Sequence, residues 1–365
     1  MNKSINVGIV GLGGGGRAQV FYFRAIDGVQ VKAICDIRDS ALESIKNEAR
    51  LNDVFATTDY NELLALKDID AISICVPDPL HAEYTTKALF AGKHVLCEKP
   101  MVTSIDECKQ VIKAVEDTGM VFAVQHQMRF VPIFSRIKTI IDSGEIGDIF
   151  VIEADYLHDL TKRAKMFDPW RLDPKNYHPP LLGAGCHFID LFRWYNPSGV
   201  KDIFCYANHI AFKEWPGDDC IMTIIKFNDG CIGKILTAFG CKRPLGHPIR
   251  IYGTKGTIVD NLMFEEERLK TLIYEPPLNK RKKLVSWCLK TFGNNYQQYP
   301  FSLYEHRLAC MNSIRDFVDA VRKGNKPLVD VYEGAKTVAL CVAGIESYSI
   351  NRPVKITKDM LFVSD

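Results

Sequence analysis

The sequence predicts an α/β protein in two parts: a parallel sheet wrapped by helices, then an α+β part with a large, mostly antiparallel open sheet. Three observations predict this fold. Short apolar runs alternate with helical patterns over residues 1–124, as in parallel βαβ units. A glycine-rich turn follows the first apolar run, and from about Ile146 long apolar runs succeed one another. The 365 residues are enough for two domains, which we expect at 1–124 and 125–365.

Composition and charge exclude several classes of protein. Hydrophobic residues make up 47% and charged residues 25% of the chain, as in ordinary globular proteins. The net charge of +2 gives no electrostatic basis for nucleic-acid binding, and no apolar run approaches the roughly 20 residues that span a bilayer. The twelve cysteines form no CxxC pair, so we expect free thiols and no metal site. The first strand starts near Ile5, which leaves no room for a signal peptide, and we expect a cytoplasmic protein.

A glycine motif joins the first strand to the first helix. The apolar run 5–10 leads into Gly11, Gly13 and Gly16, and a helical pattern covers 17–26. These glycines match G-x-G-x-x-G: the first permits a tight turn, the second lets a pyrophosphate approach the backbone, and the third lets helix and strand pack closely. The helix amino terminus adds free N–H groups and partial positive charge for phosphates. The sequence therefore predicts a Rossmann dinucleotide-binding domain over 1–124.

The second apolar run, 31–35, ends in Asp36, 20 residues beyond Gly16. An acidic residue at this place accepts hydrogen bonds from the adenosine ribose and repels a 2′-phosphate, which favours NAD over NADP. Arg38 weakens this preference, because a guanidinium binds such a phosphate, so NADP stays possible. The alternative interpretation of Asp36 is a helix N-cap, which is compatible with ribose binding.

Strands and helices continue to alternate, with helical patterns at 40–50, 80–91 and 105–118 and apolar runs at 71–76, 94–97 and 121–124. The run 94–97 stops at Glu98-Lys99-Pro100, because proline cannot donate to a sheet ladder and forces the residue before it into an extended conformation. Lys99 is therefore expected at a strand's carboxyl end, where open α/β sheets bind ligands. An ordinary surface turn is the alternative interpretation of Glu-Lys-Pro taken alone.

The second half has the pattern of an antiparallel sheet, with expected strands at 149–157, 203–212, 220–227, 231–239, 249–252 and 257–261. Asn228-Asp229-Gly230 predicts a tight hairpin turn. A predicted helix at 185–195 carries His187 and Asp190 three residues apart, so both project from one face. Histidine changes charge near neutral pH and suits general acid–base catalysis, although a His-x-x-Asp pair alone is more often a surface ion pair.

Residues 265–300 have the composition of an insertion, with Pro276-Pro277 and the basic run 280–283. This run is compatible with contact to phosphate, a membrane surface or a partner subunit, and a solvated loop is the simpler interpretation. The remaining pattern predicts two amphipathic helices at 308–322 and 332–348 and a final strand at 354–356.

Together these motifs resemble the Gfo/Idh/MocA family of oxidoreductases nearly from end to end. The family's motifs match Gly11, Gly13, Gly16 and Asp36, the segment Cys75-Val76-Pro77-Asp78-Pro79-Leu80-His81, Glu98-Lys99-Pro100, Met128-Arg129-Phe130, Gly144 to Gly147, and Gly185-Cys186-His187-Phe188-Ile189-Asp190. The order and spacing of the motifs make the resemblance specific. It implies a Rossmann domain followed by an α/β domain whose open sheet often mediates homodimers or homotetramers.

The resemblance implies hydride transfer between NAD(P) and a secondary hydroxyl or keto group of a sugar, nucleotide sugar or cyclitol. In this assignment Lys99 binds the reacting hydroxyl and the nicotinamide ribose, His187 exchanges the hydroxyl proton, and Asp190 orients His187 or binds a substrate hydroxyl. The expected cofactor-binding residues are Gly11, Leu12, Gly13, Gly16, Asp36, Arg38, Val76, Pro77, His81, Glu98, Lys99 and Gln127. The expected substrate-binding residues are Lys99, Tyr156, Trp170, Arg171, Tyr177 and His187.

The chain departs from the family before its histidine, where Gly183 stands in place of a common aspartate and Tyr177-His178-Pro179 replaces a glycine-rich turn. Tyr177 and His178 are candidates for reshaping the pocket or replacing the missing group. Two alternative functions follow. The first is a redox-neutral enzyme, such as a glycosidase, lyase or epimerase, whose bound NAD oxidises a sugar transiently. The second is a non-catalytic dinucleotide sensor, which the presence of both Lys99 and His187 disfavours.

Overall fold

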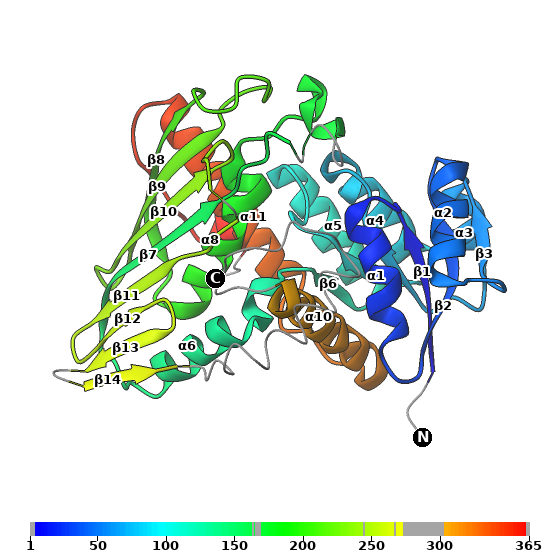
Figure 1. The fold of residues 1–365 in the computed structure, drawn as a ribbon, viewed down its shortest axis with the longest axis horizontal. Helices are drawn as coiled ribbons and strands as arrows, with labels where there is room; N and C mark the ends of the chain where they lie inside the picture. Colours follow the sequence, from blue (N-terminus) through cyan, green and yellow to red (C-terminus); the bar gives the residue numbers. More distant parts are fainter. Residues whose placement is uncertain are drawn as a thin grey trace.

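The computed structural model describes residues 4–162, 164, 169–243, 245–265, 268–272 and 303–362. Within these residues the N-terminal half forms a six-stranded parallel sheet and the C-terminal half a nine-stranded mixed sheet. Figure 1 shows the two sheets on opposite sides of the molecule, with helices α10 (Leu303–Lys323) and α11 (Val331–Ser349) between them. The predicted fold class is confirmed.

The N-terminal sheet has the strand order β3-β2-β1-β4-β5-β6, and its neighbouring strands are parallel. Its strands are β1 (Ile5–Val10), β2 (Val29–Cys35), β3 (Phe55–Thr57), β4 (Ala71–Ile74), β5 (His94–Cys97) and β6 (Phe122–Val124). The connecting helices are α1 (Gly14–Arg24), α2 (Asp39–Ala49), α3 (Tyr60–Ala65), α4 (His81–Phe90) and α5 (Ile105–Thr118). The order reverses between β1 and β4, so their carboxyl ends form the switch point where such sheets bind ligands.

Local sequence signals explain why the predicted bounds of α5 are correct. Ser104 caps the helix by accepting a hydrogen bond from the Glu107 backbone N–H, and the Glu107 carboxylate accepts one from the Ser104 hydroxyl. Ser104 and Glu107 have the Ser-x-x-Glu spacing of a capping box, and the Glu107 carboxylate also accepts from the Thr103 backbone N–H, which together fix where the helix begins. Gly119 ends the helix with φ of +64°, a left-handed conformation that glycine adopts without steric cost.

The C-terminal sheet has the strand order β14-β13-β12-β11-β7-β10-β9-β8-β15. Its strands are β7 (Ile149–Leu157), β8 (Val200–Asn208), β9 (Cys220–Phe227), β10 (Ile232–Ala238), β11 (Ile249–Gly253), β12 (Thr257–Val259), β13 (Leu262–Glu265), β14 (Arg268–Thr271) and β15 (Val354–Lys355). The pairing of β7 with β10 is parallel, and the other pairings are antiparallel. The predicted hairpin at 228–230 joins β9 to β10, with Gly230 at φ +92°.

Several elements differ from the predictions. The predicted strand 203–212 ends at Asn208, because Phe212 turns away to pack with Trp215 and Phe239 while its N–H donates to Asp219. The sequence analysis missed β3 and α3, which are short, and the hairpin of β13 and β14. The hairpin occupies the start of the predicted insertion 265–300, and the rest of that segment, 273–300, lies outside the described residues.

Two C-terminal helices, α10 and α11, pack against elements of the first half of the chain. Ile314, Phe317 and Val318 of α10 are buried in the same core as strands β1 and β2. Helix α11 packs against α5 on one side and against α8 (Cys186–Tyr195) and β8 on the other. Helix α6 (Pro132–Asp142) lies with α8 and α11 on the inner face of the second sheet (Figure 1). These contacts hold the carboxyl ends of β4 and β5 opposite α8.

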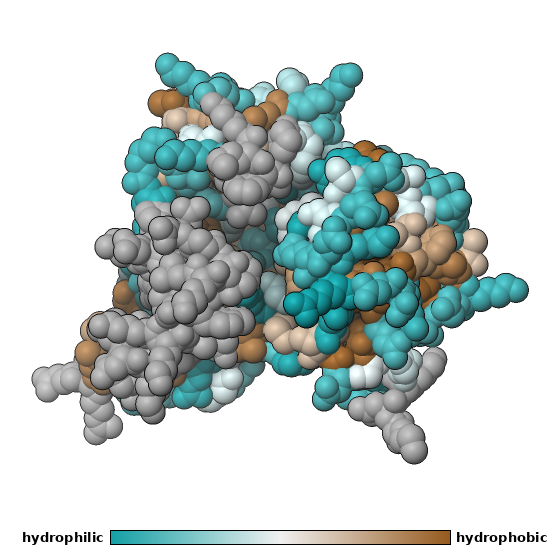
Figure 2. Space-filling view, turned by 45° about the vertical axis from the view of Figure 1, so that its right-hand side comes forward, coloured by the Kyte–Doolittle hydropathy of each residue, from teal (hydrophilic) through white to brown (hydrophobic). Residues whose placement is uncertain are grey.

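The described surface that Figure 2 shows is largely hydrophilic, with scattered hydrophobic patches. Among the helices of the described residues, none combines the length and the apolar composition that a membrane crossing requires.

Candidate active site

The glycine loop has the geometry that a dinucleotide requires. Gly11 has φ of +84°, and a Cβ there would lie 2.5 Å from the carbonyl oxygen of Cys75. A Cβ on Gly16 would lie 1.8 Å from the carbonyl oxygen of Gly11, so only glycine lets α1 pack so close to β1. Gly13 and Gly14 have open space beside them, and the first turn of α1 carries no acidic residue. The loop thus leaves backbone N–H groups accessible to a pyrophosphate.

Asp36 lies beside this loop and organises it. Its buried carboxylate accepts hydrogen bonds from the Leu12 backbone N–H (2.7 Å) and from the backbone and guanidinium of Arg38 (2.9–3.1 Å). Burial alone would raise the pKa of Asp36, but these hydrogen bonds lower it. Helix α2 begins after Arg38, and no side chain caps it, so the alternative N-cap interpretation of Asp36 is wrong. The exposed Arg38 side chain has to move aside for a ribose to reach the carboxylate.

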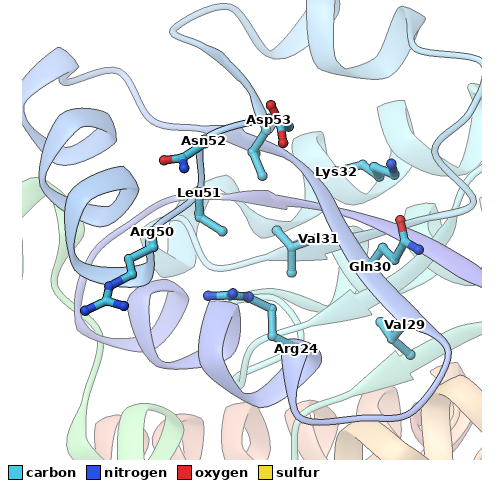
Figure 3. Close-up of a pocket in the computed structure, with 10 residues that line it drawn as sticks. Arg24, Val29, Gln30, Val31, Lys32, Arg50, Leu51, Asn52 and Asp53 are labelled. Carbon is cyan, nitrogen blue, oxygen red and sulfur yellow. The ribbon is translucent and has the colours of Figure 1, made fainter.

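These residues fit NAD at the switch point between β1 and β4. A separate hollow lies at the opposite end of β2, between Val29–Lys32, the end of α1 and residues 50–54 (Figure 3). None of the predicted site residues lines it. Ligands of open parallel sheets bind at the carboxyl ends of the strands, and this hollow is at the amino end of β2.

Lys99 connects the two halves of the molecule. It follows β5, and its Nζ donates a hydrogen bond to the carbonyl oxygen of Gly183 (2.8 Å), in a π-helical turn that precedes α8. The neighbouring Glu98 accepts a hydrogen bond from Gln19 of α1 (2.8 Å). Burial raises the pKa of Glu98, although Lys99 and Gln19 oppose this effect. The Glu-Lys pair is thus part of a cross-domain contact, and the surface-turn alternative does not apply.

His81 supports the loops around this contact. Its Nδ1 lies 2.7 Å from the Pro100 carbonyl oxygen and its Nε2 3.0 Å from that of Val76, and the side chain is fully buried. Carbonyls only accept, so both ring nitrogens donate and the ring is protonated. Burial opposes this charge, but Cys97, Asp78 and Pro100 raise the pKa of His81 to about 10. His81 therefore fixes the loops that carry Val76 and Pro77, and both of its nitrogens are already engaged.

His187 lies in the first turn of α8 and is only 3% exposed. Its ring stacks parallel to that of Tyr156 of β7 and meets His126 edge-on, with centroids 6.1 and 5.9 Å away. Its Nδ1 is buried without a hydrogen-bond partner in the described part of the chain. Burial, and then the positive charge of Lys99, lower the pKa of His187 well below its usual value. The ring is therefore neutral near pH 7 and able to accept a proton.

Asp190 has partners other than His187. Its carboxylate forms a bidentate ion pair with Arg129 (2.6 and 2.8 Å) and accepts from Thr337 (3.4 Å). The alternative interpretation, a surface ion pair between His187 and Asp190, does not apply, because both residues are buried. Burial would raise the pKa of Asp190, but the positive charge of Arg129 and its hydrogen bonds lower that pKa. Asp190 anchors α8 to η2 (Gln127–Phe130), which follows β6 and carries the predicted cofactor residue Gln127.

His178, one of the residues at which the sequence departs from the family, contacts Asp78. This buried carboxylate accepts hydrogen bonds from His178 Nε2 (2.6 Å) and Arg171 Nη1 (3.2 Å). The His178 ring packs over Gly183, where a Cβ would lie only 2.7 Å from His178 Cε1. Gly183 thus leaves the space that the imidazole occupies. Asp78 follows β4 and His178 precedes α8, so this cluster also spans the two halves.

The other predicted substrate residues lie in different places. Trp170 and Arg171, in η3 (Pro169–Leu172), stack with the guanidinium 4.2 Å from the indole centroid. Tyr156 stacks on His187. Tyr177 packs its ring on Gly217, with its hydroxyl 3.5 Å from the Asp218 carbonyl. The structure therefore brings Tyr156 to His187 and Arg171 to Asp78, and gives Tyr177 a packing contact.

Sequence reasoning assigned no role to three residues near the site, although two of them, Asp78 and Arg129, lie in the quoted motifs. His126 lies against His187, Arg129 pairs with Asp190, and Asp78 holds His178. Asp78 and His126 each follow a strand of the parallel sheet, and that position is the signal that pointed to Lys99. The pairing of Arg129 with a residue 61 positions later had no local signal.

Comparisons with known proteins agree with this geometry. A model described as an oxidoreductase family with an NAD-binding Rossmann fold matches residues 5–126. A second model, described as the C-terminal α/β domain of the same oxidoreductase family, matches residues 138–356. The chain belongs to the Gfo/Idh/MocA oxidoreductase family. The predicted family, the NAD cofactor and the class of NAD(P)-dependent dehydrogenase or reductase are thereby confirmed.

Members of this family resemble the chain over nearly its whole length. An uncharacterized oxidoreductase of Bacillus subtilis, YrbE, is 31% identical over 98% of both chains. A myo-inositol 2-dehydrogenase of Thermotoga maritima is 24% identical over 96% of this chain and 98% of its own. The crystal structure of scyllo-inositol dehydrogenase from Lactobacillus casei with NAD(H) and scyllo-inositol superposes with a TM-score of 0.78 at 20% identity, covering 97% and 99% of the two chains. The last comparison shows the shared fold.

Proposed function

We propose that this oxidoreductase transfers a hydride between NAD and a secondary hydroxyl or keto group of a cyclitol or sugar. One observation carries the proposal. Lys99, at the carboxyl end of β5, donates a hydrogen bond to the Gly183 carbonyl, one turn before His187. The Lys99 ammonium group of the cofactor domain and the neutral His187 imidazole of the opposing helix α8 are thus held near each other. Oxidation of an alcohol needs a hydrogen-bond donor for its oxygen and an acceptor for its proton.

The two groups have complementary roles in this mechanism. NAD, bound at the glycine loop and Asp36, supplies the hydride acceptor. Lys99 binds the oxygen of the reacting carbinol and keeps it in position. His187, which burial keeps neutral, takes the hydroxyl proton in oxidation and returns it in reduction. A positioned base of this kind contributes about 10²–10⁴-fold to the rate. Gln127, Trp170 and Tyr156 complete the proposed binding surfaces, with Arg171 acting through Asp78.

The names of relatives support a polyhydroxylated substrate. They include myo-inositol 2-dehydrogenase, scyllo-inositol 2-dehydrogenase (NAD(+)), levoglucosan dehydrogenase and 1,5-anhydro-D-fructose reductase. The compound mentioned in each of these enzyme names is a ring compound that carries several hydroxyl groups. We therefore place cyclitols and monosaccharides ahead of nucleotide sugars as substrates.

A homodimer or homotetramer in the cytoplasm is part of the proposal. The outer face of the nine-stranded sheet carries exposed apolar side chains in two groups: Tyr206, Ile224 and Ile232 on β8, β9 and β10, and Leu262, Phe264 and Leu269 on β13 and β14. The helices of the described residues cover the other face (Figure 1). Exposed apolar side chains that gather on one face of a sheet favour association with a second copy.

The test is NADH formation, followed at 340 nm, with purified protein, NAD and a panel that includes myo-inositol, scyllo-inositol and levoglucosan. We expect turnover with at least one compound and none with the Lys99→Ala variant, which still binds NAD. Product formation without net NADH, from cofactor retained through purification, would favour the redox-neutral alternative. A protein that binds no NAD would contradict the proposal altogether.

A further inference from the structure

We propose that His178 is a second imidazole of the active site, which Asp78 orients so that Nδ1 accepts a hydrogen bond from a substrate hydroxyl. This inference rests on the proposed function and adds a residue that determines which polyol is accepted. No proton or electron is transferred at His178.

The contact with Asp78 fixes the ring. His178 Nε2 and Asp78 Oδ2 are 2.6 Å apart, and both side chains are at least nine-tenths buried. Burial would raise the pKa of Asp78, but Arg171 and His178 hold it far below its usual range. An ionised carboxylate only accepts, so the hydrogen must lie on Nε2 of His178. A carboxylate that selects one histidine tautomer in this way is the arrangement found behind the histidine of a catalytic triad.

The opposite nitrogen of His178 is the functional atom. Nδ1 is buried and has no hydrogen-bond partner within the described residues. Buried polar atoms are rarely left unpaired, because each costs about 1–3 kcal/mol. A ligand hydroxyl that donates to Nδ1 would remove this cost, and an analogue without that hydroxyl would not.

The position of the ring places Nδ1 beside Gly183, the residue that binds Lys99. His178 packs over Gly183, and Nδ1 lies 3.2 Å from where a Cβ of residue 183 would be. The carbonyl of the same glycine holds Lys99, and His187 begins one turn later. The imidazole of His178 thus occupies the space that a side chain at position 183 would take.

His187 and His178 differ in what orients them. His187 Nδ1 has no hydrogen-bond partner in the described part of the chain, and the carboxylate of Asp190 is engaged by Arg129. His178 has a carboxylate at 2.6 Å. The structure therefore supplies a free, neutral ring for proton exchange and a fixed ring for recognition, and this difference separates their roles.

The first experiment replaces the acceptor and keeps the donor. In His178→Gln the amide N–H₂ retains a donor for Asp78, while the acceptor at Nδ1 is lost. We expect kcat/KM for the best polyol to fall 10- to 100-fold, mainly through KM, with the Kd of NADH unchanged in a fluorescence titration. The matched control is His209→Gln, an exposed histidine whose Nε2 lies 3.1 Å from the Phe212 carbonyl oxygen, and it leaves kcat/KM unchanged. An unchanged KM in His178→Gln would overturn the inference.

A second experiment tests the space over Gly183. In Gly183→Ala the new Cβ displaces the His178 ring, so kcat/KM falls as much as in His178→Gln. In a His178→Ala background the ring is absent, and adding Gly183→Ala costs less than twofold. Losses that multiply in the double variant would show that Gly183 acts independently of His178 and would overturn the proposed geometry.

A third experiment reads the tautomer without turnover. In protein labelled with ¹⁵N at its nine histidines, the signals missing from His178→Gln identify His178. We expect a protonated Nε2 and a bare Nδ1 at pH 7, and a changed tautomer in Asp78→Asn. A protonated Nδ1 would overturn the inference. If Lys99→Ala abolishes turnover while His178→Gln leaves kcat/KM unchanged, the inference about His178 fails and the proposed function stands. If the wild-type protein forms no product with NAD, both the inference and the proposed function fail.

Discussion

Asp190 forms a bidentate ion pair with Arg129, at 2.6 and 2.8 Å, although His187 precedes it by three residues on the same helix. Arg129 also donates to Glu333 of α11 at 2.8 Å. The pair therefore joins the end of the Rossmann sheet to two helices of the second half. Both side chains of this ion pair are at most 3% exposed, and the pair therefore acts mainly by fixing the position of α8.

The Arg129–Asp190 pair makes a prediction about stability. Removing one partner leaves the other charge buried and unpaired, which costs about 3–5 kcal/mol. Arg129→Met should therefore lower the free energy of unfolding by that amount in urea titrations. The control is Lys87→Met, which breaks an exposed ion pair with Glu83 and should cost less than about 1 kcal/mol. Equal small losses in both variants would contradict a structural role for the pair.

The Asp36–Arg38 contact predicts cofactor preference. Asp36→Ala removes the acceptor for the ribose and releases Arg38, which is then able to bind a 2′-phosphate. We expect the Kd of NADH to rise at least tenfold while that of NADPH changes little or falls, both measured by fluorescence titration. Asp39→Ala, an exposed acidic residue in the first turn of α2, should change neither constant. Parallel losses for both nucleotides would mean that Asp36 acts only by holding the Leu12 N–H.

The glycine loop predicts a contrast between two neighbouring substitutions. Gly16→Ala places a Cβ 1.8 Å from the Gly11 carbonyl oxygen, so the helix or the loop has to shift. Overpacking of this kind costs about 1–3 kcal/mol. Gly14→Ala meets open space and should change the free energy of unfolding by no more than about 0.5 kcal/mol. Thermal unfolding of the two variants checks this, and similar melting temperatures would rule out the close packing of α1 on β1.

His126 predicts the response of stability to acid. Burial lowers the pKa of His126 to about 4, from an ordinary value near 6.5. Between these values the unfolded chain binds the extra proton, so this group's contribution is present above pH 6.5 and is lost as pH falls toward 4. The total loss from one such group is about 3 kcal/mol.

The variant His126→Phe tests this assignment. Neither ring nitrogen of His126 has a hydrogen-bond partner within the described residues, so an apolar ring of similar shape should cost less than about 1.5 kcal/mol at pH 7. Urea titrations at pH 7 and pH 5 should show a smaller decrease in stability for the variant than for the wild type. An identical decrease would mean that His126 is protonated in the folded protein or does not titrate in this range.

Local signals sufficed for much of the fold. The strand 94–97 and the helix 105–118 were predicted at their observed bounds, because a proline, a capping box and a C-terminal glycine mark their ends. Short elements such as β3 and α3 were missed, because three and six residues are too few to show a period. The strand 203–212 was predicted too long, because Phe212 is as apolar as a strand residue and is buried in another cluster.

The sequence alone determined the Rossmann half, the glycine loop, the acidic Asp36 and the placement of Lys99 and His187, because each depends on neighbours within a few residues. Tertiary structure alone decided that Asp190 pairs with Arg129, 61 positions earlier, and that His178 reaches Asp78, 100 positions earlier. Such pairs form where two halves of a chain pack together. Burying each charge alone costs free energy, and the direct contact between the two partners offsets that cost only once the halves have packed, so no local pattern in the sequence records the pairing.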